Sequence, residues 1–188
     1  MSGVIGVSPS MKSGVLGAHP AGFQKSIAII GDNKAYETHG KNMTGGYTSP
    51  SGEGTWDIRD LNTKFFDEDS IVSISANIFT LQPAKYYIEW GAPCYGGSQN
   101  ISRLYNVTAA HIEAYSAVDY NHAGGTGLSS GWRVLTITTA SEFKVEHNCQ
   151  NENAAQGHGH GAYYNGSTLT IDSFPVGVFL VVRIHKYT

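Results

Sequence analysis

Cysteine, charge and long apolar runs are all scarce in this chain of 188 residues. Its two cysteines, Cys94 and Cys149, are too few for a disulfide scaffold, and they could form a structural zinc site only if histidines completed it. We expect both to be buried thiols, because cysteine is among the residues most often found in protein interiors. Whether they pair stays open, since a bridge would need adjacent strands and an oxidising compartment.

Charged residues make up 14% of the chain, with 12 Lys and Arg against 15 Asp and Glu. The basic residues are scattered, so no stripe of positive charge can neutralise a row of phosphates, and we expect no nucleic-acid partner. The longest apolar run, Val176 to Val182, is far shorter than the ~20 residues that span a membrane, so we expect no membrane insertion. Residues 1–20 are interrupted by Gly, Ser and Pro and lack the apolar segment of a secretory signal.

Glycine and tyrosine are abundant, with 23 and 11 residues, and this composition favours short strands and tight turns. Alternation of apolar and polar residues between turn signals predicts the strands. They are expected at residues 24–30, 54–61, 71–75, 78–81, 86–92, 102–107, 110–120, 131–139, 142–149, 159–164 and 176–186. The pattern predicts an all-β chain, and periodicity alone leaves an immunoglobulin-like sandwich and a jelly roll as alternatives.

A short repeat distinguishes the N-terminal segment. Residues 2–9, SGVIGVSP, recur as residues 13–20, SGVLGAHP, and glycines flank the apolar residues of each copy. Such a segment has little means of burying itself, so a partner surface or the body of the chain must cover its apolar side chains. We therefore predict a docking arm at 1–22 and a folded domain at 23–188, with a simply packed or frayed terminus as the alternative. The expected docking residues are Val4, Ile5, Val7, Val15 and Leu16.

The last expected strand is apolar on both faces. One face is expected to carry Val178, Leu180, Val182 and Ile184, and the other Phe179 and Val181. Because only one face of a sandwich strand packs inward, an apolar second face predicts contact with a neighbouring subunit or with the arm. Phe179 and Val181 are therefore the predicted subunit-interface residues, and a trimer or other oligomer is the hypothesis.

His158 and His160 are the strongest chemical signal. Their spacing on a strand would place both imidazoles on one face, and neutral histidine is the commonest metal ligand. Beside a threefold axis, three such pairs would suit a transition-metal ion, whereas the alternative is a mobile polar loop with no third ligand. No catalytic residue is expected, because Glu146 and His147 lie on opposite strand faces and no Ser or Cys sits in a nucleophile elbow.

Several sequence segments resemble those of known protein families. Residues 79–90, FTLQPAKYYIEW, and residues 173–180, SFPVGVFL, resemble the hairpin and closing strand of C1q/TNF-like jelly rolls. A bacteriophage virion-protein family of that fold is resembled at residues 2–17, 56–63, 71–75, 92–95, 103–108 and 146–150. Departures from that family are Ala84, where relatives usually carry Gly, and the Gly-His-Gly-His-Gly stretch at residues 157–161, where they carry a plainer glycine-aromatic stretch.

The resemblance implies an antiparallel β-sandwich of jelly-roll topology with an extended N-terminal arm. It also implies a trimeric, non-enzymatic virion component, either a capsid decoration protein or a tail-fibre part. No heptads or fixed-period repeat follow residue 23, so the sequence does not indicate a fibre shaft. A capsid decoration role is favoured, because the weak contacts of many copies add up on the capsid lattice.

The expected partners are two further copies of the chain and the major capsid protein or another virion protein, with assembly in the host cytoplasm. One alternative is a receptor-binding head that recognises a host-surface glycan or protein, and another is a glycan hydrolase. Exposed tyrosines stack on sugars and proteins at little entropic cost, although ordinary packing of these rings is the simpler interpretation. The tyrosines concerned are Tyr47, Tyr95, Tyr115, Tyr120, Tyr163 and Tyr164.

Overall fold

The computed structural model describes residues 25–34, 55–122, 124–151, 157–158, 163–164, 167–168 and 177–187. All regular elements in these ranges are β-strands, and they contain no helix that could cross a membrane. The predicted docking arm, residues 1–22, and His160 lie outside the described residues.

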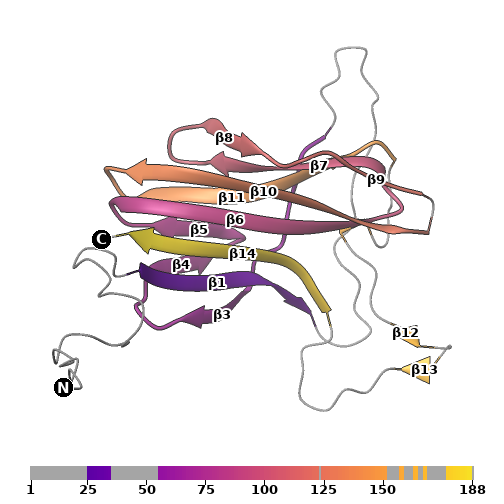
Figure 1. Cartoon of the computed structure of the whole chain (residues 1–188), viewed down its shortest axis with the longest axis horizontal. Coiled ribbons are helices and arrows are strands. Elements are labelled where there is room, and N and C mark those ends of the chain that lie inside the picture. The colour runs from indigo at the N-terminus through magenta and orange to yellow at the C-terminus, as the bar shows by residue number, and fades with distance from the viewer. Residues whose placement is uncertain are drawn as a thin grey trace, which may run out of the picture.

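Two antiparallel sheets pack as a sandwich, as the sequence predicted (Figure 1). The first sheet has the order β10 (Thr126–Ile137), β6 (Ala84–Tyr95), β14 (Gly177–Tyr187), β1 (Lys25–Lys34), β3 (Thr63–Asp67). The second has the order β4 (Val72–Ser75), β5 (Ile78–Leu81), β11 (Ser141–Cys149), β7 (Ser98–Asn106), β8 (His111–Tyr115). In this seven-stranded sheet β2 (Asp57–Ile58) also pairs with β11, and β9 (Asp119–Asn121) with β7. A separate hairpin joins β12 (Tyr163–Tyr164) and β13 (Ser167–Thr168).

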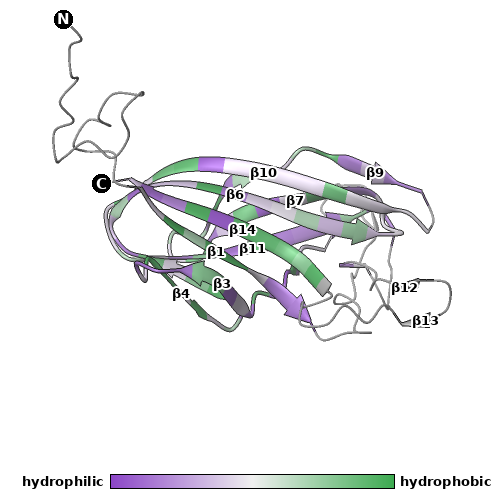
Figure 2. Cartoon of the chain, turned by 60° about the horizontal axis from the view of Figure 1, so that its bottom comes forward, coloured by the Kyte–Doolittle hydropathy of each residue, from purple (hydrophilic) through white to green (hydrophobic). Residues whose placement is uncertain are grey.

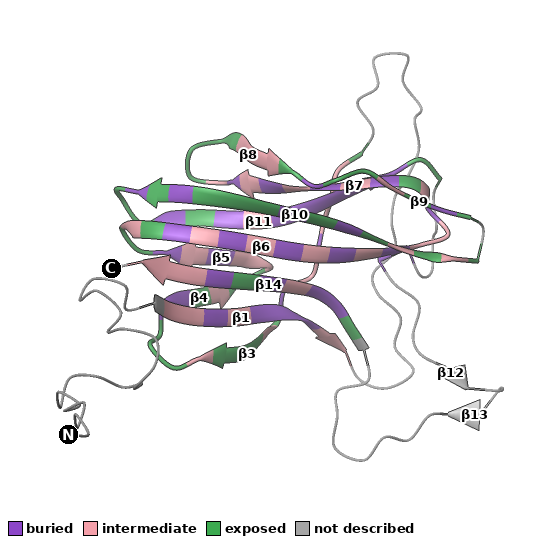
Figure 3. Ribbon diagram, in the orientation of Figure 1, coloured by how far each residue is buried: buried purple, intermediate pink, exposed green. Residues whose placement is uncertain are grey.

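The core lies between the sheets and follows the alternation of each strand (Figure 3). In β6 every second residue is buried, namely Tyr86, Ile88, Trp90, Ala92 and Cys94. All of these except Cys94 lie in one core with side chains from β5, β7 and β11, where the rings of Phe79 and Phe143 stack with centroids 5.6 Å apart. The period of two in the sequence therefore positions both faces of the sandwich.

A β-bulge changes the facing of β14 at its start. Asp32 of β1 pairs with Leu180 and Asn33 with Val178, so Phe179 is the extra residue. Phe179 is consequently buried, with 3% of its surface exposed, whereas Val178 is 43% exposed. The expectation that Phe179 lies on the outer face is wrong, and so is the inward placement of Val178. From Leu180 onward the alternation is as predicted, with Val181 on the outer face between the buried Leu180 and Val182.

Candidate functional site: an apolar outer face and a buried polar network

The outer face of the five-stranded sheet carries large apolar side chains that are open to water in the single protomer. On β10, Leu128, Trp132 and Val134 are 57%, 64% and 44% exposed. On β14, Val178 is exposed and Val181 is half-buried, and Figure 2 shows hydrophobic segments in both strands. We call these five residues the apolar outer face. Single exposed apolar residues are ordinary on a protein surface, but a group on neighbouring strands marks an interaction surface.

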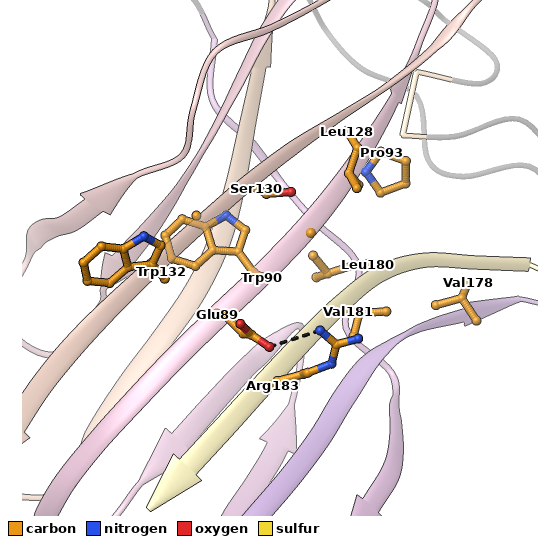
Figure 4. Close-up of a pocket in the computed structure, with 12 residues that line it drawn as sticks. Glu89, Trp90, Pro93, Leu128, Ser130, Trp132, Val178, Leu180, Val181 and Arg183 are labelled. Carbon is orange, nitrogen blue, oxygen red and sulfur yellow. Dashed lines mark hydrogen bonds and ion pairs between the residues drawn. The ribbon is translucent and has the colours of Figure 1, made fainter.

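A groove with a volume of about 510 Å³ crosses this face. Leu128 and Trp132 line it from β10 and Val181 from β14 (Figure 4), and Gly91 of β6 also belongs to its lining. At its edge Arg183 Nη1 lies 3.0 Å from Glu89 Oε1, so the charges there are paired within the protomer. An apolar groove with an ion pair on its edge can bind an apolar side chain of a partner without leaving an unpaired charge.

Aromatic rings continue the apolar outer face across three strands. Trp132 of β10 stacks on Tyr87 of β6 at a centroid distance of 6.3 Å, and Tyr87 contacts the ring of His185 of β14 at 5.7 Å. Tyr87 Oη donates a hydrogen bond to Glu89 Oε2 at 3.2 Å. Burial, assisted by the charge of Glu89, raises the pKa of Tyr87, so its hydroxyl stays a donor at neutral pH. Aromatic residues of this kind are enriched at protein interfaces.

A second group of polar residues lies buried between the sheets, around Arg59. Arg59 is 1% exposed, and its Nη1 donates to the carbonyl oxygen of Pro93 at 2.9 Å. Its Nη2 donates to the carbonyl oxygens of His158, at 3.0 Å, and Phe179. Burial lowers the pKa of Arg59 to about 10, so the guanidinium remains charged at neutral pH. One side chain thus ties the end of β6, the start of β14 and the turn at 157–158 together.

His147 of β11 belongs to the same network. Its Nδ1 lies 3.2 Å from Arg59 Nη1, and its Nε2 lies 3.1 Å from Asn100 Oδ1 and 3.3 Å from Ser129 Oγ. Because a guanidinium only donates, Nδ1 accepts and Nε2 carries the proton. Burial, with the charge of Arg59, holds the pKa of His147 well below its usual value. His147 is therefore a neutral, structural imidazole.

The approach of Ser129 to His147 was not anticipated from the sequence. A serine next to a histidine can form a nucleophile and base, but here both side chains are fully buried. Nε2 already carries a proton, and Arg59 opposes the protonation that a general base requires. The Ser129 hydroxyl instead bonds Ser102 Oγ at 2.8 Å, which also accepts from Trp90 Nε1. The arrangement holds the sheets together and is unsuited to hydrolysis.

No family model and no curated protein matches this chain. Among solved structures, it is similar to murine APRIL at pH 5.0, with a TM-score of 0.50, 7% identity, and coverage of 87% of this chain and 99% of that chain. The globular domain of the zebrafish complement 1qA protein gives a TM-score of 0.49 at 16% identity, covering 87% of this chain and 96% of that one. The chain has the C1q/TNF-like jelly-roll fold. The immunoglobulin-like alternative is thereby excluded.

Within this jelly roll the predicted site residues lie apart from one another. Val181 is on the apolar outer face and Phe179 is inside the protomer, so only Val181 remains a predicted interface residue. The docking residues Val4, Ile5, Val7, Val15 and Leu16 are outside the described residues. Sequence reasoning missed Leu128, Trp132 and Val134, although every second residue of β10 from Leu128 to Val134 is exposed and three of these four are large and apolar.

His158 is placed differently from its expected position on a strand. It lies in a turn and is 1% exposed, and its ring stacks on that of His147 at a centroid distance of 6.2 Å. Its imidazole therefore lies inside the protomer instead of on an outward strand face. Among the residues that the structure describes, no group of three His, Cys, Asp or Glu side chains could hold a metal ion. Because His160 is outside those residues, metal binding by His158 and His160 stays a prediction.

Proposed function

We propose that the chain is a non-enzymatic structural module that forms a homotrimer through the apolar outer face. The observation that carries the proposal is the exposure of Leu128, Trp132, Val134 and Val178 on one face of one sheet. Burial of a fully exposed side chain of this kind contributes about 1.5–3 kcal/mol, and since these are about half exposed, each adds roughly half of that on association. The edge pair Glu89 and Arg183 is already matched within the protomer and leaves no net charge to repel a second copy.

A second copy of the chain is the occupant that these features favour. The same face supplies both large side chains and a groove, so the protrusion of one protomer can enter the depression of the next. Such a heterologous contact closes into a ring when the rotation is suitable. The sequence resemblance to trimeric jelly rolls sets the expected number at three.

For the biological role, we propose a bacteriophage capsid decoration protein that docks through residues 1–22. The virion-protein phrases at residues 2–17 and 56–63 support this role, as does the lack of heptads or a fixed-period repeat after residue 23. Apolar residues between glycines suit an arm whose side chains a partner surface covers. The body of the trimer would then face outward from the particle.

A receptor-binding fibre head is the second candidate, favoured by exposed aromatic residues on the seven-stranded sheet. Tyr115 and Tyr120 are 52% and 62% exposed, and the Tyr115 ring lies against Trp56 with centroids 5.9 Å apart. Rings of this kind stack on sugars or on protein side chains. No hydrolase reaction is proposed at Ser129 and His147, because both side chains are enclosed and the lowered pKa of His147 keeps its imidazole neutral.

The trimer is tested with Val181→Asp, which would bury a carboxylate in the apolar contact at a cost of several kcal/mol. We expect sedimentation at micromolar concentration to give the single protomer for this variant and three copies for the unchanged chain. The matched control is Val118→Asp, because Val118 is 68% exposed before β9 and lies outside the proposed contact. A trimer that survives Val181→Asp as it survives the control would refute the proposed interface.

Docking and location on the particle are tested with a chain that lacks residues 1–22. We expect the truncated chain to remain a trimer. We also expect it to lose binding to phage particles prepared without this protein. Full occupancy by the truncated chain would contradict docking by the arm. A decoration protein is expected to coat the capsid and raise its heat tolerance, whereas a fibre head is expected in few copies and to block infection as free protein.

A further inference from the structure

Cys94 and Cys149 meet across the two sheets at one end of the sandwich. Cys94 lies near the end of β6 in the five-stranded sheet, and Cys149 is the last residue of β11 in the seven-stranded sheet. Only Gly96 and Gly97 separate β6 from β7, so the two sheets come together at this end. The cysteines are 0% and 1% exposed and form a buried cluster of their own.

Gly97 shows how closely the two side chains approach. A methyl group at this position would overlap Cys94 Sγ and lie 3.5 Å from Cys149 Sγ, so one small volume holds both sulfur atoms. The Cys149 thiol donates a hydrogen bond to the carbonyl oxygen of Asn151 at 2.8 Å, so the segment after β11 also holds this sulfur in place. A disulfide requires adjacent side chains with little backbone movement, and this arrangement provides them.

We propose that Cys94 and Cys149 are a modification site, where a disulfide reagent such as oxidised glutathione converts the two thiols into a bond that joins the two sheets. The bond would close the long loop from β6 to β11, and closure of a long loop restricts the unfolded chain and stabilises the fold. The inference concerns a single protomer and does not depend on the trimer or on the docking arm.

The surroundings of Cys94 favour the thiolate, the form that attacks a disulfide. The neighbouring Cys149 side chain is the largest cause of a lowered pKa at Cys94, and the N–H of Gly97 and the charge of Arg59 act in the same direction against burial. Arg59 approaches because its guanidinium bonds the carbonyl oxygen of Pro93, the residue before Cys94.

The reaction is two successive exchanges. The Cys94 thiolate attacks one sulfur of the reagent, forms a mixed disulfide and releases one reagent thiolate. Cys149 loses its proton and attacks the Cys94 sulfur, which forms the protein bond and releases the second thiolate. The protein dithiol is oxidised by two electrons and the reagent is reduced to two thiols, so atoms and electrons balance. Because both sulfurs are covered, the reagent enters only after this end of the sandwich opens locally, and the reaction is expected to be slow.

The experiment incubates the full chain with excess oxidised glutathione and follows its intact mass. We expect the mass to fall by two hydrogen atoms, and a proteolytic map to contain one peptide pair joined through Cys94 and Cys149. The midpoint of thermal unfolding should rise by roughly 5–15 °C and return after addition of a reductant.

Cys94→Ser and Cys149→Ser are the matched controls, and neither should show the loss of hydrogen or the shift in midpoint. If a variant does not fold, the mass and peptide map of the unchanged chain still decide. The proposal is overturned if both cysteines are alkylated after denaturation of the oxidised sample. It is equally overturned if only glutathione adducts or disulfides between chains form.

Discussion

Arg59 is the residue on which the end of the sandwich most depends. It bonds the carbonyl oxygens of Pro93, His158 and Phe179, which belong to three separate segments. Arg59→Met keeps much of the side-chain volume but leaves these buried acceptors without their donor, at about 1–3 kcal/mol for each unsatisfied group. We expect the free energy of unfolding in urea to fall by about 2–4 kcal/mol, since relief of the buried charge offsets part of the loss.

Arg133→Met is the matched control, because Arg133 is exposed on β10. A surface change of this kind should alter stability by less than about 0.5 kcal/mol. Equal stabilities of the two variants would show that the Arg59 contacts contribute little.

His147 makes stability depend on pH. Its pKa lies well below 6.5 in the folded chain because of burial and Arg59, so on acidification the unfolded chain takes up a proton first. The contribution of His147 to the free energy of unfolding is therefore fully present above about pH 6.5. It is lost as pH falls below this value, by up to about 1.4 kcal/mol per pH unit. Asp32 acts in the opposite direction at lower pH, because burial raises its pKa.

His147→Gln removes this contribution while an amide retains hydrogen-bonding groups. We expect urea unfolding at several pH values between 7.5 and 5.5 to give a shallower loss of stability for the variant than for the unchanged chain. Parallel curves for the two proteins would mean that the pKa of His147 does not differ between the folded and unfolded chain.

The inward facing of His147 follows from the alternation of residues 143–149, and this much was predictable. Its partners were not, because Arg59, Asn100 and Ser129 come from separate segments and only the packing of the sheets brings them together. The same holds for Cys94 and Cys149, whose burial was predicted and whose approach was left open.

At the scale of elements, most strands were predictable because their apolar residues alternate. β3 was missed, since Thr63–Asp67 is exposed or half-exposed throughout, and adjacent Phe65 and Phe66 give no period of two. The bulge between β1 and β14 was missed as well, because an extra residue in a run of Val, Phe and Leu leaves no mark in the sequence. That bulge is the physical reason for the wrong facing of Phe179.

Gly131 shows how one element constrains its neighbour. A methyl group at Gly131 on β10 would overlap the indole ring of Trp90 on β6, and that ring is fixed by a 2.8 Å hydrogen bond from Nε1 to Ser102 Oγ. Gly131→Ala is therefore expected to destabilise the chain by about 1–3 kcal/mol in urea unfolding.

Thr136→Ala, at an exposed position of the same strand, is the control and should cost less than about 1 kcal/mol. If Gly131→Ala lowers the free energy of unfolding no more than this control, the Trp90 ring can move away from the added methyl group. The packing between β6 and β10 would then not be as tight as described.

At the scale of the whole molecule, the all-β sandwich followed from the residues, whereas the jelly-roll topology followed only from the resemblance. Topology depends on which strands become neighbours, and a strand pattern does not encode that order. The apolar outer face was anticipated only at Val181, because the exposed residues of β10 become a surface only beside β6 and β14.

The central claim is that identical copies cover the apolar outer face. The most direct test is sedimentation equilibrium of the full chain, whose protomer has a mass of 20.2 kDa, at micromolar concentration. We predict a single species with the mass of three protomers. A stable protomer of 20.2 kDa that does not associate as its concentration rises would contradict the account.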